Sequence, residues 1–283
     1  MAREKQENEK AMGLPPKRVP ESIRSFLLEK ADTYEDASFI QDDPIAIPHR
    51  FSAPIDIEIA GFLTATLAWG NRKSILKSAD ELMRRLDHDP ARFITHASRQ
   101  ELQAASRGFV HRTFNERDAM LFFIALQRLI QQGGSLENYF IAGIQGPISE
   151  GQSPMSAGIQ AFQKAFFEAS NHEGYAPGRT QKHVARPARG SAAKRINMFI
   201  RWMARSSRRG VDFGIWSKVK PSELMIPLDV HTGRVGRKLG LLERKANDWK
   251  TVEALTASLR QIDSEDPVRL DFALFGLGAI ERF

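Results

Sequence analysis

The chain contains no cysteine. This absence excludes disulfide bonds, thiolate zinc sites, iron–sulfur clusters and cysteine nucleophiles together. No apolar run approaches the roughly 18 residues that a membrane-spanning helix needs, and the first ten residues, MAREKQENEK, lack the hydrophobic segment of a signal peptide. We therefore expect a cytoplasmic protein without a membrane partner. The seven histidines form neither an HExxH motif nor a pair spaced by four residues, so we expect no metal site and no cofactor.

Strict alternation of apolar and polar residues, which marks a half-buried strand, is also missing from the sequence. Apolar residues recur instead at helical spacing, and the fold class that we predict is all-α. The first 20 residues mix both charges with three prolines, which predicts a disordered tail. Helices are expected on both sides of Gly70-Asn71, across 118–130, 155–166, 191–205 and 228–239, and in two segments near the carboxyl end.

The 283 residues suffice for one large domain or two lobes, and 42% of them are hydrophobic, which is enough for a substantial core. The net charge of +7 and the isoelectric point near 9.7 favour DNA or another anionic partner. The protein is expected to be a monomer.

Acidic residues are absent from Gly174 to Val211. The same segment holds ten cations: Arg179, Lys182, Arg186, Arg189, Lys194, Arg195, Arg201, Arg205, Arg208 and Arg209. On the helix expected over 191–205, Lys194, Arg201 and Arg205 lie opposite an apolar face, which predicts either a DNA-binding face or a solvated basic surface. Lys194 follows Gly190-Ser191-Ala192 in the first helical turn, where unpaired backbone amides also attract phosphate. Nearby cations favour the neutral amine that a lysine nucleophile needs.

Asp229 follows Pro227 and precedes a helical spacing of apolar residues. One interpretation is a helix N-cap, whose carboxylate accepts backbone hydrogen bonds. The other is a catalytic carboxylate that is held ionised by the same amides and stabilises a cationic sugar intermediate. Both remain open, since one residue can serve both roles. His231, two residues further on, is by itself typical of a structural histidine bound to the backbone.

The turn Trp69-Gly70-Asn71-Arg72 combines an aromatic plane, a flexible glycine, an amide and a cation. These groups could form a wedge that fills the gap left by an extruded base, although ordinary turns between helices have a similar composition.

The run Pro227-Leu228-Asp229-Val230-His231-Thr232-Gly233-Arg234-Val235-Gly236-Arg237-Lys238-Leu239-Gly240-Leu241 resembles the V-D-T-H-V-x-R-V-x-x-R-L-G-L signature of the helix-hairpin-helix DNA glycosylases. That superfamily includes endonuclease III and the 8-oxoguanine glycosylases. The resemblance implies that Asp229 is catalytic and that His231 positions it. Overall, the chain most resembles an uncharacterised bacterial family related to these enzymes.

The segment from Gly190 to Met198 is similar to the hairpin and following helix of this superfamily, G-V-G-R-K-T-A-N-V. The similarity puts Lys194 at the Schiff-base lysine of the bifunctional members, and implies DNA contacts for Gly190, Ser191 and Arg195. Ala192 stands where the superfamily has a second glycine, which weakens the phosphate-binding loop. The separation of 35 residues (229 minus 194) between lysine and aspartate is longer than in most branches.

The resemblance implies a two-lobed fold, with residues 55–211 as a central helical lobe including the degenerate hairpin. Residues 21–54 and 212–283 would form the second lobe, which carries the Asp229 helix. Trp202 and Trp216 are expected to line a base pocket, and no iron–sulfur cluster is expected. The predicted function is removal of a damaged base from duplex DNA, with or without cleavage of the resulting abasic site. The alternatives are a DNA-binding protein of the same fold without chemistry and a helical adaptor for an acidic protein.

Overall fold

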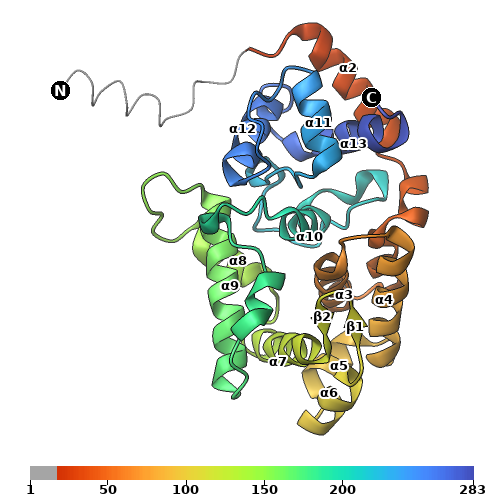
Figure 1. Ribbon diagram of the computed structural model, residues 1–283, viewed down its shortest axis with the longest axis vertical. Coiled ribbons are helices and arrows are strands. Elements are labelled where there is room, and N and C mark those ends of the chain that lie inside the picture. Colours follow the sequence, from red (N-terminus) through yellow and green to blue (C-terminus); the bar gives the residue numbers. More distant parts are fainter. Residues whose placement is uncertain (1–17) are drawn as a thin grey trace, which may run out of the picture.

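The computed structural model describes residues 18–283, so most of the tail predicted for residues 1–20 lies outside the described part. The predicted all-α class is confirmed (Figure 1). The α-helices are α2 (Glu21–Tyr34), α3 (Pro54–Leu67), α4 (Arg72–Arg85), α5 (Pro90–His96), α6 (Arg99–Ser106), α7 (Glu116–Gly133), α8 (Glu137–Ile144), α9 (Pro154–His172), α10 (Lys194–Ala204), α11 (Val230–Lys238), α12 (Trp249–Arg260) and α13 (Leu270–Phe275). A hairpin of two short strands, β1 (Val110–His111) and β2 (Phe114–Asn115), precedes α7. In the part of the chain described, no helix is both long enough and apolar enough to cross a membrane.

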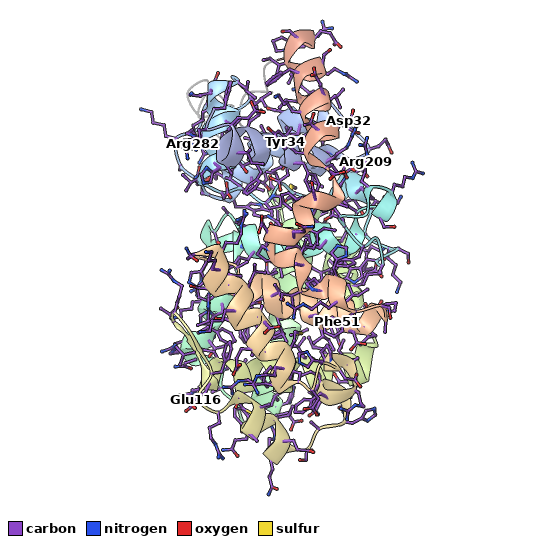
Figure 2. The ribbon with its side chains drawn as sticks, turned by 90° about the vertical axis from the view of Figure 1, so that its right-hand side faces the viewer. Asp32, Tyr34, Phe51, Glu116, Arg209 and Arg282 are labelled. Atoms are coloured by element: carbon purple, nitrogen blue, oxygen red, sulfur yellow. The ribbon has the colours of Figure 1, made fainter. Side chains whose placement is uncertain are left out.

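The helices gather into two groups with α10 between them (Figure 1). Helices α3 to α9 form one group, and α2 packs with α11, α12 and α13 in the other. The two ends of the described chain therefore meet, since α2 lies against α13. Figure 2 shows the connection from α2 to α3 running along one side of the molecule, with Tyr34 and Asp32 at its upper end. The division into the two predicted lobes stays a prediction.

The core of the larger group forms around Phe62 on α3. Its ring contacts Phe122 of α7, Phe162 and Phe166 of α9 and Phe199 of α10, with ring centroids 5.3 to 5.7 Å apart. Aromatic pairs at these distances add to the free energy gained from burying the rings. One face of α10 is thereby fixed to the larger group.

The opposite face of α10 is buried as well, against the smaller group. Arg201 and Arg205 are only 4% and 2% exposed. Arg201 Nη1 lies 2.6 Å from Asp271 Oδ2, and Arg205 Nη2 lies 2.7 Å from Glu35 Oε1 and 2.8 Å from Asp266 Oδ2. Asp212 pairs with both guanidinium groups. The prediction of an exposed DNA-binding face at Arg201 and Arg205 is therefore wrong: both cations are neutralised inside the protein.

The base pocket predicted at Trp202 and Trp216 is also wrong. Trp202 is 0% exposed, and Trp216 is 4% exposed. The Trp216 ring packs against Phe140 and Phe199, and its Nε1 donates a hydrogen bond to Glu58 Oε1 at 2.5 Å. Both indoles belong to the core, because the 212–216 segment folds back onto α10 through backbone hydrogen bonds to its last turn.

The Arg205 network should dominate the stability of the contact between α10 and the smaller group. Arg205→Ala would leave Glu35, Asp212 and Asp266 without their shared cation, and removing one partner of a buried ion pair costs about 3–5 kcal/mol. We expect a loss of this size in the free energy of unfolding, measured by urea denaturation. Arg208→Ala is the matched control, since Arg208 is exposed, and it should change this free energy by less than about 0.5 kcal/mol. Equal effects of the two substitutions would contradict the network.

Candidate functional site

Lys194 and Asp229, the two residues singled out from the sequence, lie together. Lys194 Nζ is 3.3 Å from Asp229 Oδ2, and the two side chains are 36% and 18% exposed. Lys194 is the first residue of α10, and Asp229 is the N-cap of α11. The sequence places them 35 residues apart (229 minus 194), and the fold brings the two helix starts face to face. A partly exposed amine thus stands beside a partly exposed carboxylate.

The N-cap interpretation of Asp229 is confirmed. Its Oδ1 accepts a hydrogen bond from the backbone N–H of Thr232 at 2.9 Å. This bond uses one carboxylate oxygen and fixes the side chain, which leaves Oδ2 directed to Lys194. Capping and pairing with the lysine are therefore compatible roles of one side chain.

The loop before α10 differs from a hairpin with two glycines. Gly190 has φ +80°, and the second residue with positive φ is Ala193, at +51°, rather than Ala192. A non-glycine residue in this region carries backbone strain of roughly 1–2 kcal/mol. The loop is held by Trp249, whose backbone N–H donates to the Gly190 carbonyl, and by a backbone bridge between Ser191 and Asp248. Among residues 18–283, no side chain caps α10, so its first-turn amides lack a side-chain acceptor there.

Asp271 is a site residue that sequence analysis missed. Together with Arg201 and Asp43 it borders a cavity of about 40 Å³ that Lys194 and Asp229 also line. Asp271 is 7% exposed, accepts from Arg201 at 2.6 Å and receives a long hydrogen bond of 3.5 Å from Thr232 Oγ1. Burial raises the pKa of Asp271 to about 6, Arg201 opposes this shift, and the negative charge of Asp229 adds to it. The sequence offered one signal of this role: Asp271 is an acid among the apolar residues of α13.

A family model described as a protein of unknown function, DUF2400, matches residues 43–280. The chain belongs to the DUF2400 family. The match contains Lys194, Asp229, Asp271 and the Asp43 that borders their cavity, whereas α2 lies before it. No curated protein and no solved structure matches the chain.

His231 of this DUF2400 protein contacts the carboxyl-terminal segment. Its ring is exposed at the start of α11, and Nδ1 lies 3.2 Å from the Gly278 carbonyl oxygen, which also accepts from Arg234 at 2.8 Å. Within residues 18–283, no hydrogen bond joins His231 to Asp229 or Lys194. These contacts support the interpretation of a structural histidine. His231 could position Asp229 only indirectly, by fixing α11.

The turn at 69–72 contains one half-buried residue, Trp69, and exposed residues. The half-buried Trp69 ring lies under the Arg195 guanidinium, 4.6 Å from its centre, and meets His111 edge-on. Asn71 is exposed and caps α4, and Arg72 is exposed beside it. Burial raises the pKa of Asp43, and the positive charges of Arg72 and Lys194 oppose this shift. The turn therefore borders the same region as the Lys194–Asp229 pair.

The ten cations of residues 174–211 have different surroundings in the fold. Five of them pair with carboxylates from outside that segment or at its edge: Arg179 with Asp118, Lys194 with Asp229, Arg201 with Asp271, Arg205 with Asp212, and Arg209 with Asp32. Lys182, Arg189 and Arg208 are exposed, as are Gly190 and Ser191. The basic surface of the segment is consequently smaller than its composition suggests. No three histidine or acidic side chains among the described residues are arranged to hold a metal ion.

Stability should depend on pH through Asp271. Its pKa of about 6 lies above the ordinary value of 3.8, so the folded protein binds this proton more tightly than the unfolded chain does. The free energy of unfolding should therefore fall as pH rises from about 4 to about 6, by up to about 3 kcal/mol. Asp271→Asn cannot ionise, so its stability relative to wild type should improve across this window.

The measurement is urea denaturation of both proteins at pH 4, 5, 6 and 7. The difference between the two proteins isolates Asp271, because the other titrating groups are shared. A difference that stays constant with pH would contradict the raised pKa.

Proposed function

We propose that this DUF2400 protein is a DNA glycosylase that removes a damaged base from duplex DNA, with Lys194 as nucleophile and Asp229 as the stabilising carboxylate. The observation that carries the proposal is the 3.3 Å contact between Lys194 Nζ and Asp229 Oδ2. It unites the two residues whose sequence surroundings resemble the lysine and aspartate of helix-hairpin-helix glycosylases. Neither the amine nor the carboxylate is fully buried, so a substrate atom can reach both.

The pair offers a complete set of groups for excision. The ammonium group of Lys194 can pass its proton to Asp229 and attack the anomeric carbon of the nucleotide as a neutral amine. The bond from this carbon to the base breaks as the amine attacks, and the departing base takes up the proton from Asp229. The carboxylate is thereby ionised when positive charge develops on the sugar, where it is most stabilising. The attached lysine can form an imine with the opened sugar.

Asp271 and Arg201 lie beside the Lys194–Asp229 pair and influence its charge. Asp271 shares the small cavity with the pair and is coupled electrostatically to both of its members. Its negative charge disfavours a second ionised carboxylate nearby, and the Arg201 cation offsets that effect. The protonation of Asp271 can therefore change when Asp229 gains or loses its proton.

A second candidate is a DNA-binding protein of this fold without chemistry. The loop before α10 favours it, because Ala192 stands where the superfamily has its second phosphate-binding glycine and Ala193 carries the backbone strain of a positive φ. Both DNA-based functions require an affinity for DNA that falls steeply with salt, since phosphate contacts release counterions. A salt-independent affinity, or none, would favour the acidic-protein adaptor instead.

Borohydride trapping on oligonucleotides that carry damaged bases or abasic sites tests the lysine directly. Wild type should form a covalent adduct, and Lys194→Gln should form none. Asp229→Asn should bind DNA as tightly as wild type but reduce excision at least about 100-fold, in line with the loss of one electrostatic stabilising group. Asparagine caps a helix about as well as aspartate, so this variant should remain folded.

The controls separate chemistry from folding and binding. Lys218→Gln removes a lysine that contacts Asn138 of α8 in the larger helix group, and it should leave trapping unchanged. Full excision by Asp229→Asn would reduce Asp229 to a helix cap. Salt-sensitive binding without any adduct would establish the non-catalytic candidate.

The exposed part of the 69–72 turn should contact the gap beside an extruded base. Asn71→Ser replaces the capping amide oxygen with a hydroxyl that can also cap α4 but shortens the probe, and Arg72→Gln removes the charge of Arg72. Both should lower the fluorescence increase of 2-aminopurine placed next to a lesion, because the base stack would open less. Lys73→Gln, an exposed neighbour, is the control. Signals equal to wild type in both variants would remove the turn from the mechanism.

A further inference from the structure

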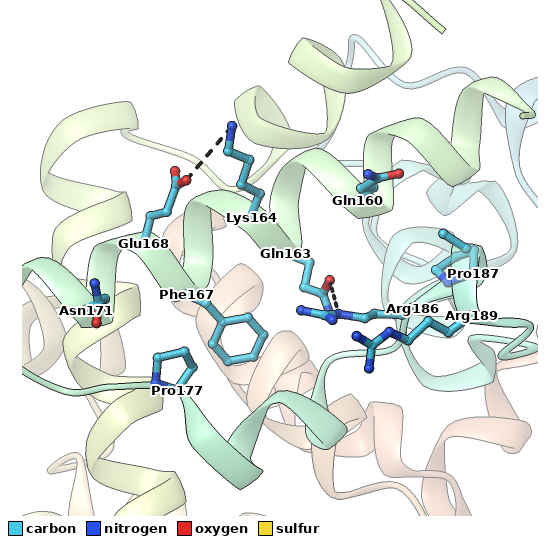
Figure 3. A pocket seen from close by; sticks show the side chains of 11 residues that line it. Gln160, Gln163, Lys164, Phe167, Glu168, Asn171, Pro177, Arg186, Pro187 and Arg189 are labelled. Atoms are coloured by element: carbon cyan, nitrogen blue, oxygen red, sulfur yellow. Dashed lines mark hydrogen bonds and ion pairs between the residues drawn. The ribbon is translucent and has the colours of Figure 1, made fainter. Parts of the chain in front are cut away.

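A groove of about 600 Å³ lies between α9 and the segment 177–189, outside the Lys194–Asp229 site. One wall consists of α9, from Gln160 to Asn171, and the other of Pro177 and the residues 186–189 (Figure 3). Residues 187–189 form a short 3₁₀-helix, and Gly190 follows directly. The groove has the size of sites that hold one nucleotide-sized ligand.

Arg186 is fixed in the groove without being neutralised. Its Nε donates to Gln163 Oε1 at 2.8 Å, and its Nη2 donates to Gln181 Oε1 at 2.6 Å. Gln163 is itself held, since its Nε2 donates to the Val184 carbonyl at 2.8 Å. Both partners are neutral amides, so the guanidinium keeps its full charge in a defined orientation.

Arg189 brings a second positive charge to the same wall. It is exposed, and its guanidinium is directed toward Arg186 (Figure 3). Within residues 18–283, neither arginine forms a salt bridge with a carboxylate. Glu168, the acid among the lining residues, lies 3.9 Å from Lys164, and both extend away from the arginines (Figure 3). Both positive charges therefore line the same groove, and an anion in the groove would reduce the repulsion between them.

The lining of the groove also contains apolar side chains among its polar ones. The Phe167 ring points into it beside Pro177, and Pro187 lies at its other end (Figure 3). A planar ring stacks favourably on such surfaces. Phe167 is 7% exposed, so its ring offers one edge of its surface to the groove. The combination of two arginines with this apolar surface matches a ligand that carries both a phosphate and a flat ring.

We propose that this groove binds a nucleotide, with its phosphate between Arg186 and Arg189 and its base against Phe167 and Pro177. The nucleotide is either free or part of a nucleic-acid strand. The inference goes beyond the glycosylase proposal and does not depend on it, because it involves neither Lys194 nor Asp229.

The test uses two probes with the full-length protein: AMP by calorimetry, and a fluorescein-labelled ten-nucleotide single strand by anisotropy at low salt. Arg189→Gln should weaken binding of the occupying probe about tenfold, the usual effect of losing one charge-assisted hydrogen bond. Phe167→Leu should weaken it as well, because the stacking surface is lost. Arg208→Gln is the control: it removes the same charge from an exposed position in the same basic segment, and should change affinity less than twofold.

Each outcome decides the proposal. Tenfold weakening for AMP identifies a site for free nucleotides, and weakening for the strand alone identifies a nucleotide within a strand. Failure of wild type to bind either probe, or equal effects of Arg189→Gln and Arg208→Gln, would overturn it. Lys194→Gln should leave both affinities unchanged, so loss of trapping in that variant and loss of nucleotide binding here are separate results. Thermal unfolding of Phe167→Leu distinguishes a lost contact from a lost fold.

Discussion

The burial of two arginines on α10 is the constraint on which the arrangement of this protein depends. Arg201 and Arg205 face the smaller helix group at 4% and 2% exposure, where an unpaired guanidinium would be very costly. They are matched by four carboxylates from three parts of the chain: Glu35, Asp212, and Asp266 with Asp271. The network therefore determines how α2, the 212–216 segment and α13 are placed around α10.

The position of the candidate site follows from this network. Once α10 is fixed on both faces, its first turn projects toward the start of α11, and Lys194 meets Asp229 at 3.3 Å. Asp271 belongs to both structures, since it binds Arg201 and lies below the pair. Asp271 thus connects the structural ion network with the Lys194–Asp229 pair, so changes at Asp271 should affect both the stability of the protein and the charge of the site.

Local patterns in the sequence predicted the all-α class, several individual helices and the Asp229 cap. They did so because helical spacing and capping depend on residues only a few positions apart. The exposed basic face was predicted wrongly for the opposite reason. The acids that neutralise Arg201 and Arg205 lie up to 170 positions away in the chain, from Glu35 to Arg205 (205 minus 35), and a helix with one apolar side gives no sign that its other side is also covered. Trp202 and Trp216 were misplaced likewise, since an indole suits a core as well as a pocket. Asp271 escaped notice because its partner Arg201 lies 70 positions away in the chain.

Locating the covalent adduct on the chain tests the central claim most directly. The claim is that Lys194 is the amine that reacts with DNA. After borohydride reduction of the wild-type protein with an oligonucleotide that carries an abasic site, nuclease and protease digestion followed by mass spectrometry would identify the modified residue. The account predicts a sugar remnant on Lys194 and on no other lysine. An adduct on another lysine or on the terminal amine, with Lys194 unmodified, would contradict it.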